Sequence, residues 1–378
     1  MKFLVLGSGA QGSACAFDLL RSPGVTEVRL ADLQVTSLAS FLPTDDPRLV
    51  PVALDVRERD TVHAEMVKVD AVLSAIPYFF NGELAALAVQ AGVHFADLGG
   101  NTEIVFGQKK LHDAAVQQGV TVIPDTGLAP GMINVLAEHG IQSMDSVESV
   151  KLFVGGLPQH PEPPLNYQIV YSIEGVLDYY STLSWVVRDG KRVQMTALSE
   201  LEPVEFGGAI GTLEAFHTAG GLSTMAWRYE GKIATMEYKT MRYPGHAHLM
   251  AAIRDLGLYD STPIDVKGVQ VVPRDVFIAQ VGPKLRKPGG TDLVALRVLV
   301  TGTKDGKPST RTYDLLDYYD EAHGITAMMR VTGYTLSITG QLMVSGALQP
   351  GVYTPDEAFP GDRYIAELAS RGIDIRIS

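Results

Sequence analysis

The chain has 378 residues, of which 46% are hydrophobic and 20% are charged, and its formal net charge is −12 at pH 7. This length favours two domains with ample material for a hydrophobic core. The negative charge argues against nucleic acid and anionic membrane surfaces as partners. Cys15 is the only cysteine, which excludes an intrachain disulfide.

The sequence also lacks the signals of export and of membrane insertion. No apolar stretch approaches the roughly 18 residues that a membrane-spanning helix needs. The first strand starts directly at the N-terminus, which leaves no space for a signal peptide. We therefore expect a cytoplasmic protein without a membrane partner.

The first twelve residues place a glycine loop between an apolar strand and a helix. Residues 3–6 are wholly apolar, as in a central strand of a parallel sheet, and Gly7-x-Gly9-x-x-Gly12 follows at once. Gly7 allows a tight turn, Gly9 lets the backbone approach a pyrophosphate, and Gly12 lets the helix pack closely on the strand. The helix N-terminus offers free N–H groups to the phosphates. This arrangement predicts a dinucleotide site.

Asp32 ends a second apolar strand, 20 residues after Gly12. A carboxylate at this position accepts hydrogen bonds from both ribose hydroxyls of an adenosine and repels a 2′-phosphate. Leu33 and Gln34 follow it in place of basic residues, so we expect NAD as the cofactor rather than NADP. The residues expected to bind NAD are Gly7, Ser8, Gly9, Ala10, Gln11, Gly12, Asp32, Asp55, Val56, Ala75, Pro77 and Asn81.

Strands and helices alternate over the first third of the chain, which predicts an α/β fold with a Rossmann-type doubly wound parallel sheet. Ligands of such sheets bind beyond the carboxyl ends of the strands, where the glycine loop, Asp32, Asp97 and residues 125–131 would lie. Strands are expected at residues 3–6, 28–31, 49–54, 70–75, 94–98 and 121–124. Helices are expected at residues 36–42, 59–67 and 83–91, and from Asn101 to about Gln118.

From about residue 151 the pattern changes to strand-like and irregular segments, which predicts a second α+β domain built on a largely antiparallel sheet. The Asp305-Gly306 pair between residues 293–303 and 310–319 is a strong hairpin signal. Helices are expected at 246–256 and 274–285, and a long apolar helix at 326–348 that returns to the first domain. We expect residues 1–125 with 326–378 to form the NAD-binding domain and 126–325 to form the substrate domain.

Polar residues of the second domain form three clusters that are candidates for chemistry. Arg242 suits forked recognition of an α-carboxylate, with a surface ion pair as the alternative. His217 suits proton transfer near neutral pH, with a histidine that merely caps a glycine turn as the alternative. Lys239 and Arg242 would face opposite sides of a regular strand, so only one of them points into a cleft. The clusters span Tyr171 to Gly175, Glu214 to Gly221 and Glu237 to His246.

The sequence shows no pattern that is typical of a metal site. His246 and His248 are close in sequence, but no third ligand accompanies them at a sensible spacing. We therefore expect no metal ion.

Several motifs resemble the saccharopine dehydrogenase superfamily. Besides the glycine loop, these are Asp97-Leu98-Gly99-Gly100, Gly127-Leu128-Ala129-Pro130-Gly131-Met132-Ile133-Asn134 and Val154-Gly155-Gly156-Leu157-Pro158. Within this superfamily, further motifs are similar to the branch of bacterial lysine 6-dehydrogenases. These motifs are Pro161-Glu162-Pro163-Pro164-Leu165, Ser172 to Asp178, Leu213 to Thr218 and Glu237 to Tyr243.

This resemblance runs over nearly the whole chain, and it implies an activity. The activity is NAD-dependent oxidative deamination of L-lysine at its ε-carbon, which releases ammonia and gives a semialdehyde that cyclises to a piperideine carboxylate. The resemblance also implies a homo-oligomer in which the second domain contributes to the interface.

The residue types suggest roles in such a reaction. Only a neutral amine can release a hydride from its carbon, so the site must remove a proton and later supply water. Our hypothesis is that Asp97 holds and deprotonates the amine, that His217 or Glu174 activates the water, and that Arg242 fixes the carboxylate. Two further candidates for substrate binding are Thr218 and Tyr171.

Two alternatives remain open at the level of sequence. A saccharopine dehydrogenase acts on a secondary amine with a glutamate arm, and the extra carboxylates would require a second basic residue, which Arg228 or Lys239 could supply. A non-catalytic NAD-binding sensor or scaffold is the other alternative. The same nucleotide-binding fold serves many chemistries, so fold likeness does not separate them.

Overall fold

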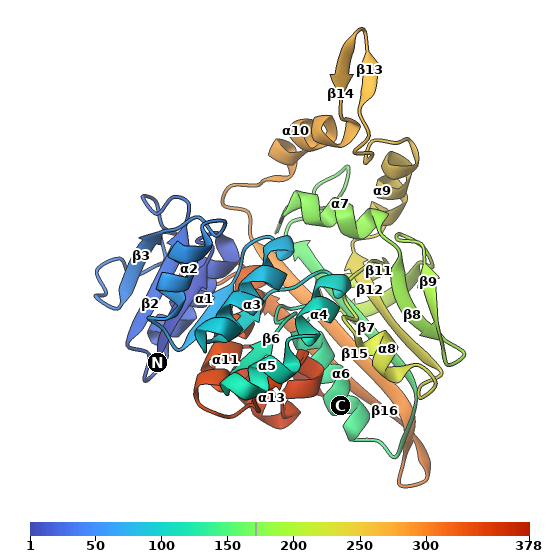
Figure 1. Ribbon diagram of the computed structural model, residues 1–378. Coiled ribbons are helices and arrows are strands. Elements are labelled where there is room, and N and C mark those ends of the chain that lie inside the picture. The colour runs from blue at the N-terminus through green and yellow to red at the C-terminus, as the bar shows by residue number, and fades with distance from the viewer. Residues whose placement is uncertain (171) are drawn as a thin grey trace.

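The computed structural model describes residues 1–170 and 172–378, and the polypeptide forms two large sheets with helices around and between them (Figure 1). Tyr171, a predicted substrate-binding residue, lies outside the described residues. None of the helices in the described part of the chain has the length and apolarity that a membrane span requires.

The first sheet is the expected Rossmann-type sheet. Its strand order is β17-β6-β5-β4-β1-β2-β3, and each neighbouring pair in the described chain is parallel. The order reverses at β1, which places the glycine loop at the point where ligands bind in such folds. The strands are β1 (Lys2–Leu6), β2 (Glu27–Asp32), β3 (Leu49–Ala53), β4 (Ala71–Ser74), β5 (His94–Asp97), β6 (Thr121–Ile123) and β17 (Gly351–Val352).

Helices cover both faces of this sheet (Figure 1). The long helix α11 (Ala327–Val344) packs on the first helix α1 (Ala10–Arg21), as predicted. Gly333 permits this approach, because a Cβ at Gly333 would lie 2.6 Å from the Cβ of Ala14. The other helices here are α2 (Arg59–Met66), the 3₁₀ helix η1 (Tyr78–Phe80), α3 (Asn81–Ala91), α4 (Thr102–Lys109) and α5 (His112–Gln118).

The prediction of a helix at residues 36–42 is wrong, because these residues form bends and turns. Thr36, Ser37 and Ser40 compete for backbone hydrogen bonds in non-helical conformations, and Pro43 follows at once. Leu42 still packs into the core, so the apolar residues of this segment serve as anchors for a loop. The helix expected up to Gln118 is divided into α4 and α5.

The second domain is built on a nine-stranded sheet in the described chain, and the prediction of a largely antiparallel sheet is confirmed. Its main path is β10-β11-β12-β7-β15-β16-β18, and β8 and β9 branch from β12. Only β12 and β7 pair in parallel among these described strands. The strands are β7 (Ser146–Pro158), β8 (Ser184–Arg188), β9 (Lys191–Met195), β10 (Glu202–Gly207), β11 (Gly211–His217), β12 (Thr235–Arg242), β15 (Asp292–Lys304), β16 (Lys307–Tyr318) and β18 (Arg376–Ile377).

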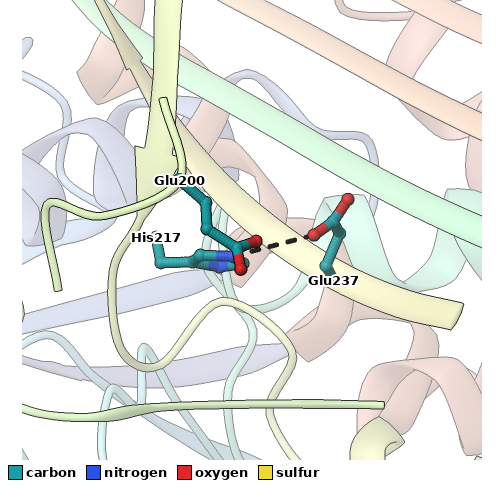
Figure 2. A group of neighbouring side chains, drawn as sticks. All are labelled: Glu200, His217 and Glu237. Carbon is teal, nitrogen blue, oxygen red and sulfur yellow. Dashed lines mark hydrogen bonds and ion pairs between the residues drawn. The ribbon is translucent and has the colours of Figure 1, made fainter. Parts of the chain in front are cut away.

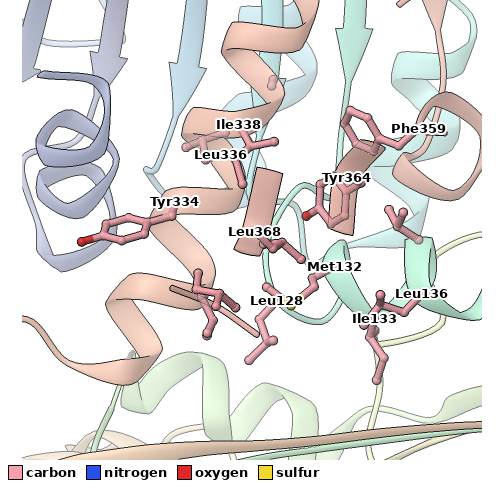
Figure 3. Packing of buried hydrophobic residues seen from close by; sticks show 14 of the residues in the cluster. Leu128, Met132, Ile133, Leu136, Tyr334, Leu336, Ile338, Phe359, Tyr364 and Leu368 are labelled. Atoms are coloured by element: carbon pink, nitrogen blue, oxygen red, sulfur yellow. The ribbon is translucent and has the colours of Figure 1, made fainter. Parts of the chain in front are cut away.

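One hydrophobic core joins the two sheets. It contains Phe3 of β1 and Leu152 of β7, and the layer between them comes from α6, α11 and α13 (Figure 3). Residues 125–131, where the boundary between the two domains is expected, lead into α6. The remaining helices are α6 (Met132–Gln142), α7 (Ile173–Ser181), α8 (Met225–Tyr229), α9 (His246–Asp255), α10 (Pro273–Leu285), α12 (Pro355–Ala358) and α13 (Gly361–Ala369).

The C-terminal segment serves both sheets. β17 pairs with β6 in the first sheet, whereas β18 pairs with β16 in the second. The chain therefore crosses between the two domains again after α11, and its end is tied to the second sheet.

Candidate active site

The glycine loop has the geometry of a phosphate cradle. Gly7 has a φ of +96°, and a Cβ there would lie 2.8 Å from the carbonyl oxygen of Ala75. A Cβ on Gly12 would lie 1.8 Å from the carbonyl oxygen of Gly7, so only glycine allows α1 to begin this close to the strand. A Cβ on Gly9 would meet no atom within 4 Å, so the space beside Gly9 is open for a ligand.

Asp32 is oriented by the same loop. Its Oδ2 accepts hydrogen bonds from the backbone N–H of Ser8 at 2.7 Å and from the Ser8 hydroxyl at 3.0 Å. The backbone N–H of Leu33 donates to Oδ1 at 2.7 Å. These donors fix the carboxylate beside the open space at Gly9, where the ribose of a bound dinucleotide would lie. The cradle and the oriented acid therefore fit a dinucleotide.

The other predicted cofactor residues lie along the same edge. Ala75 and Pro77 line a cavity that continues from the glycine loop, together with Gln11. Asn81 is buried and accepts a hydrogen bond from the hydroxyl of Ser74, which braces the loop from behind. Asp55 pairs with Arg57, and this guanidinium lowers the pKa of the Asp55 carboxyl to about 2. Ala10 is the first residue of α1, and Val56 follows Asp55 in the segment after β3.

A cavity of about 660 Å³ lies between the two domains, next to the glycine loop. Its size is in the range typical of small-molecule sites. The first domain contributes the loop after β4, the loop after β5 and the segment before α6, while the second domain contributes β7, α7 and β12. The polar residues that line it are Gln11, Tyr78, Ser172, Glu174, Asp178, Tyr179, Thr218, Tyr238, Thr240, Arg242 and Thr332.

Strand β12 presents every second side chain to this cavity. Tyr238, Thr240 and Arg242 line it, whereas Lys239 points to the other face of the sheet and binds Glu202 at 2.7 Å. The expectation that Lys239 and Arg242 face opposite sides agrees with this arrangement. The hydroxyl of Thr240 lies 2.7 Å from that of Thr218, so both threonines form part of the cavity wall.

Arg242 lines the cavity with a buried side chain that its neighbours hold in place. Only 2% of its surface is exposed, and its guanidinium lies over the ring of Tyr167, 4.9 Å from the ring centroid. Its Nη1 donates to the carbonyl oxygen of Met241 at 2.8 Å. A buried and oriented guanidinium is suited to a carboxylate of a ligand.

Helix α7 brings two carboxylates to the cavity, Glu174 and Asp178, which are one helical turn apart. The Glu174 carboxylate accepts a hydrogen bond from the Ser172 hydroxyl at 2.8 Å. Asp178 instead forms an ion pair with Arg274 at 2.7 Å. Of these two carboxylates, Glu174 is therefore the one without a salt bridge among the described residues.

Asp97 ends β5 as expected, but its side chain points into the protein. It is 1% exposed and is absent from the described cavity lining, which at this point consists of Leu98 and Gly99. Its Oδ2 accepts a hydrogen bond from Nε2 of Gln108 at 2.6 Å. Burial raises the pKa of the Asp97 carboxyl to about 7. The carboxylate lies behind the cavity wall, where it does not fit the expected contact with substrate.

His217 is also separated from the cavity: it is the last residue of β11 and does not line the cavity, whereas the next residue, Thr218, does. It is fully buried, and its Nε2 lies 3.1 Å from Glu200 and 3.7 Å from Glu237 (Figure 2). Burial lowers the pKa of its imidazole. This position does not fit the expected activation of water at the substrate.

The cluster around His217 has the ligand types of a metal site, since these three side chains come within 4.8 Å of one another. Basic residues already balance its carboxylates, however, and Arg188 bridges Glu200 and Glu237. Three basic side chains face three carboxylates in this cluster: Lys151, Arg188 and Lys239 pair with Glu200, Glu202 and Glu237. The cluster is therefore an ion-pair network, and the expected absence of a metal stays a prediction.

The sequence analysis missed several cavity residues. Tyr238 and Thr240 could have been found from the two-residue period that leads back from Arg242 along β12. Asp178 could have been found from the helical period after Glu174. Tyr179 could not be found in this way, because the helical period from Glu174 selects Asp178 and not the residue after it. Tyr179 lines the cavity because of how α7 lies against the first domain.

The glycine cradle, the acid at the end of β2 and the cavity between the domains define an NAD(P)-binding protein with a Rossmann-type domain and a second, largely antiparallel domain. Models of the saccharopine dehydrogenase NADP binding domain and C-terminal domain match residues 3–123 and 127–373. The chain therefore belongs to the saccharopine dehydrogenase family.

Individual relatives are distant. The chain is 25% identical to mouse mitochondrial α-aminoadipic semialdehyde synthase, in a match that covers 68% of this chain and 28% of the mouse protein. It is 22% identical to saccharopine dehydrogenase (NADP⁺, L-glutamate-forming) of Schizosaccharomyces pombe, over 86% of this chain and 88% of that protein. The chain thus spans less than a third of the length of the mouse protein.

A solved structure shares the fold over the full length. Apo saccharopine dehydrogenase (L-Glu forming) from Saccharomyces cerevisiae superimposes with a TM-score of 0.80 at 20% identity, and the match covers 100% of this chain and 99% of that chain. The expected fold class is confirmed by this likeness. The narrower resemblance to lysine 6-dehydrogenases stays a prediction.

Proposed function

We propose that this protein is an NAD-dependent dehydrogenase that oxidatively deaminates L-lysine at its ε-carbon. The observation that carries this proposal is the charge of the cavity. Arg242 is the only basic side chain among the described residues that line it. Two carboxylates line it as well, Glu174 without a salt bridge and Asp178 paired with Arg274. One guanidinium with nearby carboxylates suits a substrate that has one carboxylate and two amino groups.

The same observation disfavours saccharopine, whose extra carboxylates require further cations. Arg228 is occupied elsewhere, where it pairs with Glu138 at 3.0 Å and with Asp356 at 2.8 Å. Lys239 lies on the other face of β12. Neither belongs to the described cavity lining.

Saccharopine dehydrogenase is the second candidate function, and the names of the relatives favour it. Both the Schizosaccharomyces pombe protein and the Saccharomyces cerevisiae structure carry this name. If this chain also acts on saccharopine, its cavity has to accept the glutamate arm of that substrate beside Glu174. The lysine reading thus places an amino group beside Glu174, whereas the saccharopine reading places further carboxylates there.

The chemistry divides between the cofactor and the chain. NAD, when bound, supplies the acceptor for the hydride that leaves the ε-carbon. The ε-ammonium of lysine has an ordinary pKa of about 10.4, so the site must favour its neutral form. Enclosure in the cavity disfavours the ammonium, and Glu174 can take its proton. Once that proton has passed to solvent, the same carboxylate can take a proton from the water that adds to the oxidised carbon and return it to the nitrogen. Ammonia then leaves as the new hydroxyl gives up its proton.

The remaining cavity residues position the substrate. Arg242 binds the α-carboxylate and fixes one end of the molecule. Thr218, Thr240 and Tyr238 form the wall beside it, and Ala75 with Pro77 brings the first domain close to the reacting end. A neutral His217 and a buried Asp97 are not needed for any of these steps.

NAD is proposed in preference to NADP because of Asp32. Its Oδ2 already accepts two hydrogen bonds from Ser8, which holds a negative charge where a 2′-phosphate would lie. The name of the matching domain model points to NADP instead. The two cofactors must therefore be compared directly.

The test is to mix the purified protein with NAD and L-lysine and to follow nicotinamide reduction together with ammonia release. We expect reduction with an equal amount of ammonia, and much slower reduction with NADP. Reduction with saccharopine but not with lysine would favour the second candidate. Binding of NAD without turnover of either substrate would favour a non-catalytic sensor.

A further inference from the structure

Three tyrosines of the described chain line the cavity, and their hydroxyl groups differ in their surroundings. The hydroxyl of Tyr238 lies 3.4 Å from that of Thr240, and Tyr78 is 37% exposed. Tyr179 of α7 is partly buried, and no hydrogen bond joins its hydroxyl to any of the described residues. A ligand in the cavity is therefore the partner that this hydroxyl can bind.

The hydroxyl of Tyr179 lies against the first domain. A Cβ on Gly100 would lie 2.8 Å from its oxygen, and a Cβ on Gly220 would lie 3.2 Å from Cε1 of the ring. Gly100 comes shortly after β5 in the first domain, whereas Gly220 comes shortly after β11 in the second. The ring is therefore held between the two domains, with its hydroxyl near the end of β5.

The order of strands in the first sheet shows where the oxidation takes place. Asp32, which fits the ribose of the adenosine half of a dinucleotide, ends β2 on one side of β1. The other half of the dinucleotide therefore extends to the opposite side of the glycine loop, over the ends of β4 and β5. Ala75 and Leu98, which follow these two strands, line the cavity. The reacting carbon of a substrate must lie at this end, on the side of the Tyr179 hydroxyl.

Tyr179 is suited to donate a hydrogen bond rather than to accept a proton. Burial raises the pKa of its phenol, and the neighbouring Asp125 carboxylate adds to this effect. The hydroxyl therefore keeps its proton near neutral pH and donates to an atom with a lone pair. The positively charged nitrogen of an oxidised amine has no lone pair. The oxygen that water adds to the oxidised carbon has two.

We propose that Tyr179 donates a hydrogen bond to this oxygen and thereby speeds the hydrolysis that follows hydride transfer. In this step the carbon–nitrogen bond breaks, and its electron pair leaves with the protonated nitrogen. The hydroxyl loses its proton to Glu174 as the carbon–oxygen double bond forms. Negative charge develops on the oxygen while the proton leaves, and a fixed donor stabilises that charge. Tyr179 itself keeps its proton throughout.

This proposal rests on the proposed function only in one respect, namely that a carbon–nitrogen bond is oxidised and then hydrolysed. It holds for lysine, from which ammonia leaves, and for saccharopine, from which glutamate leaves. Both substrates therefore enter the test.

The test compares Tyr179→Phe with the unmodified protein. Phenylalanine keeps the ring between Gly100 and Gly220 and removes only the hydroxyl. Tyr318→Phe is the control, because Tyr318 is 46% exposed on β16 and is absent from the described cavity lining. Calorimetry measures NAD binding and thermal unfolding of all three proteins.

Two further measurements separate hydride transfer from hydrolysis. Stopped-flow absorbance follows nicotinamide reduction in the first turnover and in the steady state. Sodium borodeuteride, added during turnover, reduces any accumulated iminium ion back to the parent amine with one deuterium on its carbon. Mass spectrometry then detects the deuterated substrate.

For Tyr179→Phe we expect unchanged NAD binding and an unchanged rate of the first turnover, followed by a steady state about 100-fold slower. Deuterated substrate should be recovered mainly from this variant. Unchanged steady-state turnover, or a slow first turnover without deuterated substrate, would overturn this proposal and leave the proposed function standing. An unmodified protein that binds NAD but reduces it with neither substrate would overturn both.

Discussion

The guanidinium of Arg242, which lines the cavity between the domains, lies over the ring of Tyr167, 4.9 Å from the ring centroid. The stacked ring restricts the guanidinium to one orientation, which preserves its fork for a carboxylate. A lysine side chain is neither planar nor forked, so it cannot keep this arrangement.

Arg242→Lys should therefore weaken binding of the amino acid and leave NAD binding almost unchanged. We expect KM for lysine to rise about 10- to 100-fold, which corresponds to about 1.4 to 2.7 kcal/mol of lost interaction. Steady-state kinetics with lysine and NAD varied in turn measures both values. Equal effects on both KM values would indicate that Arg242 has a structural role.

Glu174 and Asp97 provide a second, paired prediction. Glu174→Gln should lower kcat about 100-fold or more, because it removes the carboxylate that the proposed mechanism uses for proton transfer. Asp97→Asn should have a much smaller effect, since Asp97 is buried behind the cavity wall. A larger loss of kcat in Asp97→Asn than in Glu174→Gln would indicate that Asp97 is the catalytic residue.

Two glycines of the loop allow the effect on stability and the effect on NAD binding to be measured separately. Gly9→Ala adds a methyl group to open space, so its thermal stability should stay close to that of the unmodified protein, while the Kd for NAD rises about tenfold or more. Gly12→Ala places a methyl group 1.8 Å from the carbonyl oxygen of Gly7 and should cost at least about 3 kcal/mol of stability. Calorimetry of unfolding and of NAD binding checks both expectations. Similar stability for the two variants would contradict this account of Gly12.

Burial of Asp97 predicts a dependence of stability on pH. Its carboxyl has a pKa of about 7 in the folded protein against an ordinary value of 3.8, so the folded state retains a proton that the unfolded state loses. The free energy of unfolding should therefore fall as pH rises from about 4 to about 7. Because Asp97→Asn removes this titration, its stability should fall less than that of the unmodified protein between pH 5 and pH 8.

Urea unfolding at the two pH values measures this difference. Asp55→Asn is the control, because the pKa of Asp55, about 2, and its ordinary value of 3.8 both lie below this range. An unchanged fall in Asp97→Asn would mean that other groups, such as Asp125, carry the pH dependence. The pKa of the buried Asp125 carboxyl is also raised, to about 6.

The sequence by itself determined the elements whose signals are local. The glycine spacing, the apolar strands, the Asp305-Gly306 turn and the helix at 327–344 depend on neighbouring residues, so their periods and turn residues predicted them. The two-residue period of β12 likewise separated Arg242 from Lys239. In each case the physical cause lies within a few residues of the feature.

Only the tertiary structure decided which polar residues reach the cavity. Asp97 ends its strand on the expected edge, but Gln108 holds its side chain inside the protein. His217 and Thr218 are adjacent in sequence, and only the three-dimensional arrangement at the end of β11 selects Thr218 for the cavity. Glu174 and Tyr179 line it because α7 lies against residues far away in sequence. The direction of a side chain at the end of an element depends on such distant partners, and no local period encodes them.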